Sequence, residues 1–511
     1  MTSLGEVLAE GRRIEAHRPR PRIEVDAEAW TAIAGLLAGG RGTLMSLWSD
    51  GEAVHMAVRE DGKAEVEVVS LAVPERRFPS VARLHPPALR LERTIRDLYG
   101  IDAEGAPDAR AWLDHRRWGV RAPLGAAGPE PAEGAPYAFL EAVGAPLHQI
   151  PVGPVHAGII EPGHFRFSAS GETVVGLEER LGYVHKGIDG LLAGAPLDRA
   201  TRLAGRVSGD STVAYSLAFC SAAEAALAIE VPPRAVLLRA LMAELERVAN
   251  HFGDIGAICN DASFSLMHAH CGVLRERVLR AADAALGHRL MMDRIVPGGT
   301  AVDLPRESIV SLRGLIEEVR RRFPPLVRLY DNTVSLQDRT VGTGFLPPRL
   351  AQQYGCGGPV GRASGRLFDA RRALAYPPYP DLRFDVPTRS QGDVDARVWI
   401  RIEEVGQSLA IIGQILDRLA DGPVRADPAT AGPAEGGGGT AREGLAVVEG
   451  FRGDILAWVR VGGDGTILRC HLRDPSWFQW PLLEAAIEGN IVADFPLCNK
   501  SFNCSYSGHD L

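Results

Sequence analysis

The sequence predicts an α+β protein in two parts: a small N-terminal α/β module and a large, mostly helical domain with short peripheral strands. Alternating apolar residues predict strands within the first 71 residues. Apolar residues at three- and four-residue spacing predict long helices between residues 211 and 420. A Pro- and Gly-rich linker at 121–136 separates the module (1–120) from the second domain (137–511).

The module is expected to contain one helix at residues 30–37, ended by Gly39-Gly40, and a small sheet. A Ser49-Asp50-Gly51 turn separates its first two strands. The predicted strands are 43–48, 53–58 and 64–71.

The second domain is expected to contain long helices and then a pair of strands. The predicted helices are 211–230, 232–258, 263–295, 306–333 and 393–420, and the predicted strands are 445–449 and 455–461. The segment 421–444 has four consecutive glycines, but no strand precedes it and no helix follows it. We therefore predict a flexible loop there and not a phosphate-binding site.

Composition narrows the class of protein. The net charge of −8 argues against a protein that coats nucleic acid. There is no run of about 18 apolar residues that would predict a transmembrane helix, and no targeting signal at the N-terminus. Seven cysteines without a C-x-x-C pair indicate a reducing compartment. A cytoplasmic protein is expected.

Two short segments concentrate polar side chains. His156, Glu161 and His164 lie within eleven residues that end at Arg166, although a solvated loop would have the same composition. His185 lies in a Tyr-Val-His-Lys-Gly run, for which the alternative is the C-terminal cap of a helix.

Two predicted helices also carry charged faces. On 232–258, Glu244, Arg247 and His251 are three or four residues apart and share a face. Helix 393–420 repeats the pattern with Arg397, Arg401 and Glu404. A solvated face is the alternative for both. Phosphate-loop, dinucleotide and nucleophile-elbow motifs are absent, so spacing alone names no reaction.

Motifs in both parts resemble known families. An E-R-x-x-x-D-x-x-G-I run at Glu92–Ile101, followed by P-D-x-R at Pro107–Arg110, resembles the 30-kDa subunit of respiratory complex I. From residue 153 the chain resembles the large subunit of membrane-bound, energy-converting nickel–iron hydrogenases, which are related to the 49-kDa subunit of complex I. The matching runs include Gly153–His156, Glu161–Phe167, Glu179–Gly187, Glu244–His251, Asp338–Gly344 and Gly392–Arg397. Formate hydrogenlyase large subunits fuse both modules in this way.

The resemblance implies four metal-binding cysteines, and this sequence has none of them. The hydrogenases hold nickel and iron with R-x-C-G-x-C and D-P-C-x-x-C motifs, which correspond here to Arg206–Ser211 and Asp474–Gln479. The four ligand positions carry Ser208, Ser211, Ser476 and Gln479. Hydroxyls and a neutral amide are poor substitutes for soft thiolates. We therefore expect no nickel, no iron and no hydrogen chemistry.

The resemblance also implies where a site would lie. The candidate catalytic residues are Glu161, His164, Arg452, His156, His185 and Asp210. Arg452 resembles the arginine that faces the hydrogenase metals, and Glu161 and His164 resemble a polar loop at the mouth of the site. In complex I the equivalent cavity receives quinone, which is a candidate ligand here, although the tyrosine that holds its headgroup aligns with Gly209.

The resemblance implies an oxidoreductase subunit that binds no cofactor directly, with quinone as the one candidate. Electrons would come from a 4Fe–4S cluster in an iron–sulfur small subunit that resembles the complex I 20-kDa subunit. Antiporter-like membrane subunits and formate dehydrogenase are candidate partners, and they would hold the chain on the inner face of the cell membrane. The alternatives are a non-catalytic scaffold, an NADH-quinone oxidoreductase C/D-like subunit, and a nickel enzyme with unusual ligands. Formate, NADH and ferredoxin remain open as donors.

Overall fold

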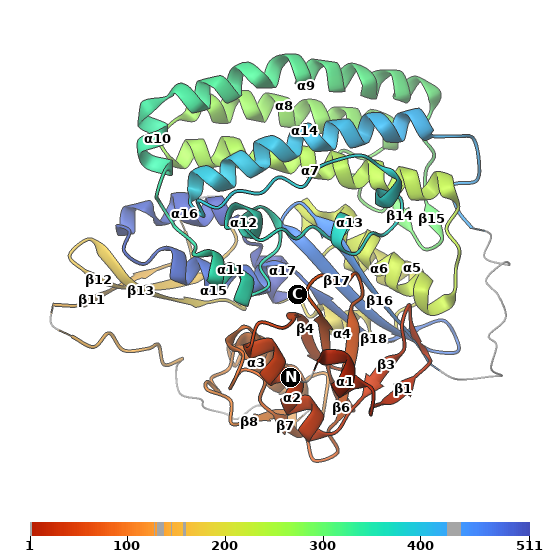
Figure 1. Cartoon of the computed structure of the whole chain (residues 1–511), viewed down its shortest axis with the longest axis vertical. Coiled ribbons are helices and arrows are strands. Elements are labelled where there is room, and N and C mark those ends of the chain that lie inside the picture. The colour runs from red at the N-terminus through yellow and green to blue at the C-terminus, as the bar shows by residue number, and fades with distance from the viewer. Residues whose placement is uncertain (1–2, 127, 130–136, 145, 157–159, 427–440) are drawn as a thin grey trace.

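The computed structural model describes residues 3–126, 128–129, 137–144, 146–156, 160–426 and 441–511. Figure 1 shows three layers: long helices at the top of the view, a sheet of C-terminal strands in the middle, and the N-terminal module below. The predicted α+β class, with a small module and a larger helical domain, is confirmed.

The module is built on a five-stranded sheet in the order β1-β3-β6-β5-β4. The strands are β1 (Arg12–Ile14), β3 (Arg22–Glu24), β4 (Thr43–Ser49), β5 (Ala53–Arg59) and β6 (Glu67–Ala72). Helix α2 (Ala27–Ala38) begins after Asp26, whose side chain accepts a hydrogen bond from the Ala29 N–H at 2.8 Å. Helix α3 (Leu89–Tyr99) packs against β4. The predicted helix and strands of the module are confirmed.

The long helices of the second domain follow the predicted periodicity. They are α6 (Thr212–Leu227), α7 (Pro233–Asp261), α8 (Ser265–Leu286), α9 (Arg306–Asn332) and α14 (Val394–Arg418). Helix α8 ends well before the predicted residue 295. The reason is Gly287, which takes a left-handed conformation (φ +73°) and donates its N–H to the Asp283 carbonyl. Helix α7 packs against both α8 and α14.

The middle layer is a four-stranded sheet in the order β18-β17-β16-β2. The strands are β16 (Arg442–Gly450), β17 (Gly453–Val461), β18 (Ile467–Arg473) and β2 (His17–Arg18). Helix α6 packs against β16 and β17, and the module supplies Trp48, whose ring lies 5.8 Å from that of Trp458. Strand β2 belongs to the module yet pairs in parallel with β16, so the two parts of the chain share a sheet.

The remaining elements are short. The strands are β7 (Arg77–Pro79), β8 (Asp102–Glu104), β9 (Val120–Arg121), β10 (Gly128–Pro129), β11 (His148–Val152), β12 (His164–Ser170), β13 (Thr173–Arg180), β14 (Ile295–Val296) and β15 (Gly299–Thr300). The helices are α1 (Leu4–Leu8), α4 (Ile188–Leu192), α5 (Leu197–Ala204), α10 (Val334–Thr340), α11 (Pro348–Gln353), α12 (Gly358–Ala363), α13 (Ala370–Ala373), α15 (Ser476–Ala486), α16 (Phe495–Phe502) and α17 (Tyr506–Asp510).

The predicted linker and loop fall largely outside the described residues. Of 121–136, residues 121 and 128–129 pair as β9 and β10, and 127 and 130–136 are not described. Of 421–444, residues 427–440 are not described. Within the described ranges, none of the helices combines the length and the apolar character that a membrane crossing requires.

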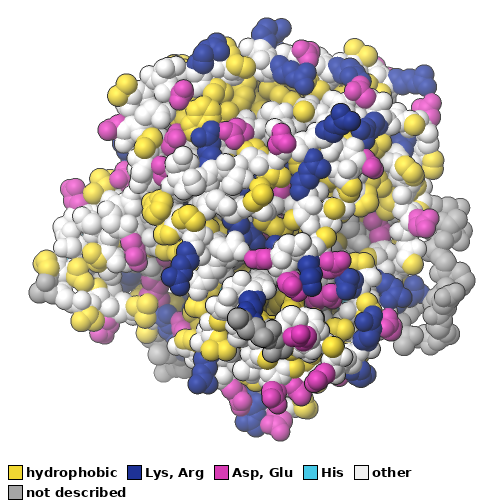
Figure 2. Space-filling view, viewed as in Figure 1, with side chains coloured by type: hydrophobic (Ala, Val, Ile, Leu, Met, Phe, Trp, Pro, Cys, Tyr) yellow, Lys and Arg dark blue, Asp and Glu magenta, His cyan; other side chains and the backbone are white. Residues whose placement is uncertain are grey.

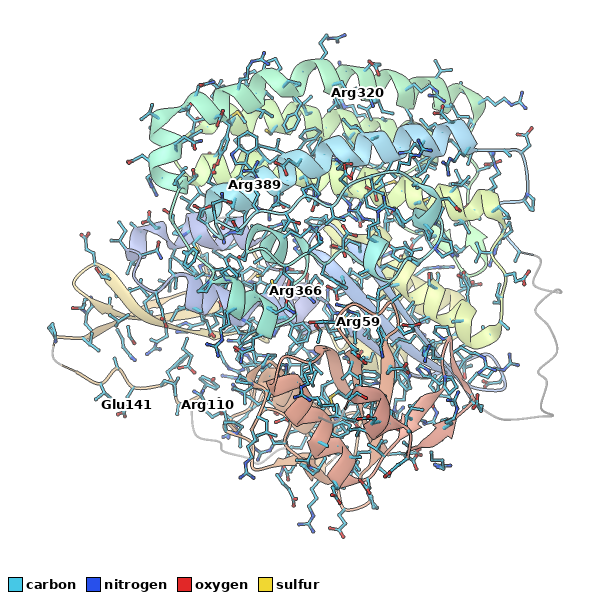
Figure 3. The ribbon with its side chains drawn as sticks, in the orientation of Figure 1. Arg59, Arg110, Glu141, Arg320, Arg366 and Arg389 are labelled. Atoms are coloured by element: carbon cyan, nitrogen blue, oxygen red, sulfur yellow. The ribbon has the colours of Figure 1, made fainter. Side chains whose placement is uncertain are left out.

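The charged faces of α7 and α14 are buried, so the solvated alternative is wrong for both helices. Glu244 and His251 on α7 are 0% exposed, and Glu404 on α14 is 1% exposed. The two faces meet each other instead of water, and their charges pair across the contact. Figure 3 labels a buried and an exposed arginine: Arg366 lies inside the molecule, whereas Arg320 on α9 lines an open groove beside α14 and its side chain is 53% exposed. Over the face seen in Figure 2, basic and acidic side chains are interspersed.

Candidate functional site

The two segments predicted from the hydrogenase ligand motifs meet in the structure. Arg206–Ser211 leads into α6, and Asp474–Gln479 leads into α15. The residues at the four ligand positions, Ser208, Ser211, Ser476 and Gln479, are all buried. Ser505 joins the two segments: its N–H donates to Ser476 Oγ at 2.8 Å, and its Oγ lies 3.3 Å from Ser208 Oγ.

An ion pair between the buried Arg452 and the partly exposed Asp210 lies at the centre of this cluster. Arg452, in the turn between β16 and β17, donates to both carboxylate oxygens of Asp210, at 2.8 and 2.5 Å. It also donates to Ser211 Oγ at 3.1 Å and to the Asn503 carbonyl at 2.6 Å. Burial alone would raise the pKa of Asp210, but Arg452 and the Ser208 hydroxyl outweigh it and hold that pKa below its usual range. Arg452 thus makes four hydrogen bonds to these partners.

Gln479 closes the other side of the cluster. Its side-chain N–H₂ donates to the carbonyls of Arg452 (2.8 Å) and Gly357 (3.2 Å). The Cys504 sulfur lies 4.0 Å from Gln479 Oε1, and burial raises the pKa of this thiol well above its ordinary value. The Cys504 thiol, which contacts Gln479, is therefore held in its protonated form in this structure.

These residues do not fit a nickel–iron centre. Three hydroxyls and a neutral amide stand where the resemblance implies four cysteines, and neither kind of group replaces a soft thiolate ligand. Across the part of the chain that the structure describes, no group of three or more His, Cys, Asp and Glu side chains is arranged to hold a metal ion.

One glycine allows the backbone to approach Arg452 closely. Gly358 opens α12 with φ +65°, and a Cβ built there would lie 1.9 Å from the Arg452 carbonyl oxygen. A side chain at this position would push the α12 turn away from the ion pair.

The predicted loop at the mouth of the site is held by its histidines. His156 Nε2 lies 2.8 Å from the Gly163 carbonyl, and His164 Nδ1 lies 3.1 Å from the Gly153 carbonyl, so both bind the backbone of this loop. Burial lowers the pKa of His164. Glu161 is exposed and accepts the Ser507 N–H at 3.2 Å. The alternative of a wholly solvated loop is wrong for His164, which is 8% exposed.

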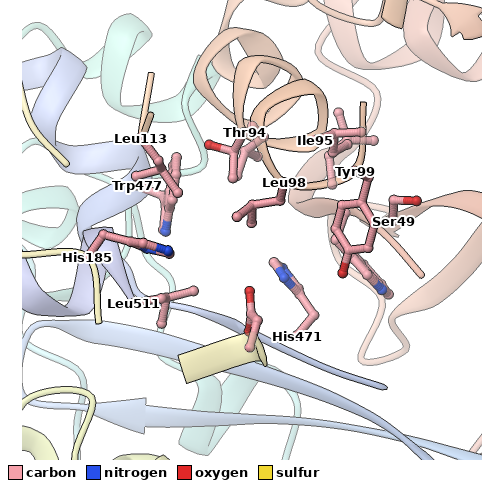
Figure 4. A pocket seen from close by; sticks show the side chains of 14 residues that line it. Ser49, Thr94, Ile95, Leu98, Tyr99, Leu113, His185, His471, Trp477 and Leu511 are labelled. Atoms are coloured by element: carbon pink, nitrogen blue, oxygen red, sulfur yellow. The ribbon is translucent and has the colours of Figure 1, made fainter. Parts of the chain in front are cut away.

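His185 does not join the other candidates. Its Nδ1 binds the Asp510 carbonyl at 2.7 Å, and its ring lines a separate cavity (Figure 4). The helix-cap alternative is wrong, because Gly187 precedes α4 and β13 ends at Arg180. The neighbouring Lys186 links the His185 segment to the segment that contains Asp210, because its Nζ donates to the Val207 carbonyl at 2.6 Å.

The structure gives partners to charged residues of α7 and α14, and it adds Asn503, which the sequence did not mark. Asp254 on α7 accepts from Asn503 Nδ2 at 2.9 Å and from Arg401 on α14 at 3.1 Å. Deeper in the domain, His251 lies 2.7 Å from Glu404, which also pairs with Arg362 at 2.5 Å. The charged residues on α7 and α14 were visible as spaced sets, but the C-terminal partners had no local pattern to mark them.

The chain matches known proteins over both of its parts. Two family models match: respiratory-chain NADH dehydrogenase, 30 Kd subunit, over residues 23–129, and respiratory-chain NADH dehydrogenase, 49 Kd subunit, over residues 262–435. The chain is 32% identical over 443 residues to formate hydrogenlyase subunit 5 of Escherichia coli, covering 85% of this chain and 77% of the relative. It is 30% identical over 470 residues to hydrogenase-4 component G of the same organism, covering 90% and 80%.

A solved structure agrees with this assignment. A chain from the membrane-bound sulfane sulfur reductase (MBS), an archaeal respiratory membrane complex, superimposes with a TM-score of 0.65 and 26% identity over 71% of this chain and 98% of that chain. The protein is an oxidoreductase subunit of the class shared by NADH dehydrogenases and membrane-bound hydrogenases. Within that class it belongs to the family of formate hydrogenlyase subunit 5 and hydrogenase-4 component G, in which the 30 Kd and 49 Kd modules are fused.

Proposed function

We propose that the chain receives electrons from an iron–sulfur partner subunit, in a complex of the formate hydrogenlyase or complex I type, at a site that works without nickel and iron. One observation carries the proposal. Arg452 and Ser505 make hydrogen bonds to the serines at three of the four positions, and Gln479 at the fourth donates to the Arg452 carbonyl, so the chain's own polar groups occupy this place. The family membership supports the electron-transfer role.

The partner is proposed to bind at the loop beside the site. Val155 is 88% exposed, Ile160 is 52% exposed and Tyr183 is 37% exposed, and the first two adjoin the candidate residues His156 and Glu161 in the sequence. Exposed apolar side chains at one place are typical of a protein interface. Lys186 and the exposed Glu161 add charge at the same rim. An iron–sulfur subunit bound here would lie beside Asp210.

Membrane association is proposed to come through further subunits on the inner face of the cell membrane. The relatives include a membrane-bound hydrogenase subunit alpha of Pyrococcus furiosus, and the solved neighbour belongs to a respiratory membrane complex. Antiporter-like membrane subunits and a formate dehydrogenase are the partners to look for. Purification of the native complex, with identification of its subunits, tests this point and names the donor.

Metal analysis tests the metal-free site. The complex should be purified and its nickel and iron measured by mass spectrometry, together with hydrogen-dependent reduction of a viologen dye. We expect no nickel, iron only in the amount of the partner's clusters, and no hydrogen oxidation. One nickel atom per chain would overturn the proposal.

Substitution of Arg452 separates a catalytic site from a scaffold. In Arg452→Met, we expect the complex to assemble while electron transfer falls at least tenfold. Arg320→Gln, at an exposed position of α9, is the control and should leave electron transfer unchanged. Unchanged electron transfer in an intact Arg452→Met complex would favour the scaffold.

Quinone as the acceptor stays a prediction. The loop that would face the headgroup includes residues 157–159, which lie outside the described residues. Binding of a short-chain quinone analogue to the assembled complex, measured with and without Glu161→Gln, is the direct test. If the analogue neither binds nor inhibits the complex, quinone is excluded as the electron acceptor.

A further inference from the structure

A small, partly open cavity lies at the contact between the N-terminal module and the large domain (Figure 4). Its volume is about 30 Å³, and a buried water needs roughly 10–15 Å³ measured in this way, so the cavity has room for water. The module lines one side with Leu98 and Tyr99 of α3, and the large domain lines the other with His185, Asp189 and His471. The wall is therefore mostly apolar, with a few polar groups from both parts of the chain.

Asp189 is the unpaired carboxyl in this wall, among the described residues, and the indole N–H groups of Trp48 and Trp477 also lack a partner there. Asp189 is 9% exposed, and its Oδ1 has no hydrogen-bond partner among the described residues. Burial raises the pKa of this carboxyl to about 7. An ionised carboxylate without a partner is strongly disfavoured in such a place, whereas a protonated one can donate a hydrogen bond to a cavity water.

The groups around Asp189 supply no compensating cation. His471 on β18 is neutral, because burial lowers its pKa to about 3, and its Nε2 lies 2.7 Å from Ser46 Oγ. Burial also lowers the pKa of His185 and raises the pKa values of Tyr99 and Cys470.

The charged groups near the cavity are engaged elsewhere. Asp50 accepts the N–H groups of Glu52 and Ala53 and pairs with Arg460 at 3.1 Å. Arg469 donates to the Asp50 carbonyl at 3.1 Å. Leu511, which also lines the cavity, uses its carbonyl to accept the N–H groups of Lys186 and Gly187.

We propose that this cavity is a proton-binding site whose occupancy controls how firmly the two parts of the chain stay together. In the closed form Asp189 keeps a proton that it gives up when the contact opens to water. The closed form binds the proton more tightly, so protonation favours closure. The contact is therefore most stable near pH 4. As the pH rises towards 7, the equilibrium constant for opening increases by up to about tenfold per pH unit. This inference goes beyond the proposed electron transfer and does not depend on it.

Hydrogen–deuterium exchange of the full-length chain tests the proposal. Opening of the amides of α3 and β18 should be measured between pH 5 and 7, with the rates corrected for the intrinsic pH dependence of exchange. We expect opening to increase by about tenfold per pH unit in the native sequence. In Asp189→Asn, which keeps the shape and removes the charge, the increase should disappear.

Asp198→Asn is the matched control, because this carboxyl on α5 has a side chain that is 71% exposed. It should keep the native pH dependence. An Asp189→Asn chain with the native pH dependence overturns the proposal. If that variant does not fold, the native chain alone tests the proposal. A corrected opening rate that does not change between pH 5 and 7 also overturns the proposal.

Discussion

The hydroxyl oxygens of Ser208 and Ser505 lie 3.3 Å apart, although 297 residues separate them in the sequence. Ser208 stands at a position where the resemblance implies a metal-binding cysteine, and Ser505 comes from the C-terminal segment after α16. The Ser505 hydroxyl donates to Ser208 Oγ in a hydrogen bond that is longer than usual for two hydroxyls. The contact shows that the C-terminal segment is part of the site.

The Arg452–Asp210 pair is expected to stabilise the fold. Asp210→Asn leaves the buried Arg452 guanidinium without its counter-charge and should lower the free energy of unfolding by about 2 kcal/mol. The loss is smaller than for a fully buried pair, because the Asp210 side chain is partly exposed. Since the pKa of Asp210 lies below its usual range, its contribution is present above about pH 4 and is lost as the pH falls through the folded-state pKa. Urea unfolding at pH 7 and in acid measures both effects.

The control for this change is Asp293→Asn. Asp293 also receives two hydrogen bonds from an arginine, Arg206, but both side chains are more than a third exposed. A loss of at most about 1 kcal/mol is expected there. Equal losses in the two variants would contradict a special role for the central pair.

Neighbouring glutamates on α14 should respond differently. Glu404→Gln removes a charge that faces Arg362 and His251 in the interior, and should cost about 3 kcal/mol in the free energy of unfolding. Glu403→Gln breaks a partly exposed pair with Arg389 and should cost less than about 1 kcal/mol. Similar costs, measured by chemical denaturation, would mean that the buried network adds little.

Gly358 and Gly365 test the close approach to Arg452. Both have positive φ, but a Cβ at Gly358 would meet the Arg452 carbonyl, whereas one at Gly365 would meet nothing within 4 Å. Gly365→Ala should therefore cost only backbone strain, about 1 kcal/mol. Gly358→Ala should cost more than about 3 kcal/mol, because the backbone must also shift. Thermal unfolding of the two variants gives the comparison, and equal midpoints would argue against the close contact.

Buried histidines should make the fold sensitive to acid. Neither ring nitrogen of His85 has a partner among the described residues, and burial lowers the pKa of His85 from 6.5 to about 4. Between pH 6.5 and pH 4 the unfolded chain thus binds a proton that the folded chain does not bind. The free energy of unfolding therefore falls as the pH drops through this range, by up to about 1.4 kcal/mol per pH unit. His85→Leu should reduce this slope, and the exposed His148→Gln should leave it unchanged. A native slope in His85→Leu would contradict the assignment.

The sequence predicted the elements whose residues interact locally. Helices such as α7 and α14 were predicted because their apolar spacing depends only on the helix repeat. The end of α8 at Leu286 was missed, since Gly287 was not recognised as a cap within an apolar run. The burial of Glu244 and Glu404 could not be predicted either, because a charged face has the same spacing whether it meets water or a second charged face.

The candidate site was predicted in part. The convergence of Ser208 and Gln479 with Arg452 followed from the resemblance, which carries three-dimensional information that spacing lacks. Asn503 and Ser505 were missed because their partners lie far away in the sequence. His185 was placed with the site because of its neighbours in the chain, and the structure places its ring at the cavity between the two parts instead.

The pairing of β2 with β16 has a practical consequence for dissecting this protein. A fragment that begins after the module would leave the hydrogen-bonding groups of Glu443 and Gly444 without the strand that now covers them. An uncovered edge strand is a template for association with other chains. The large domain produced alone should therefore aggregate. A loss of electron transfer after deletion of the 30-kDa-like part would then reflect poor solubility and not a direct role of that part in electron transfer.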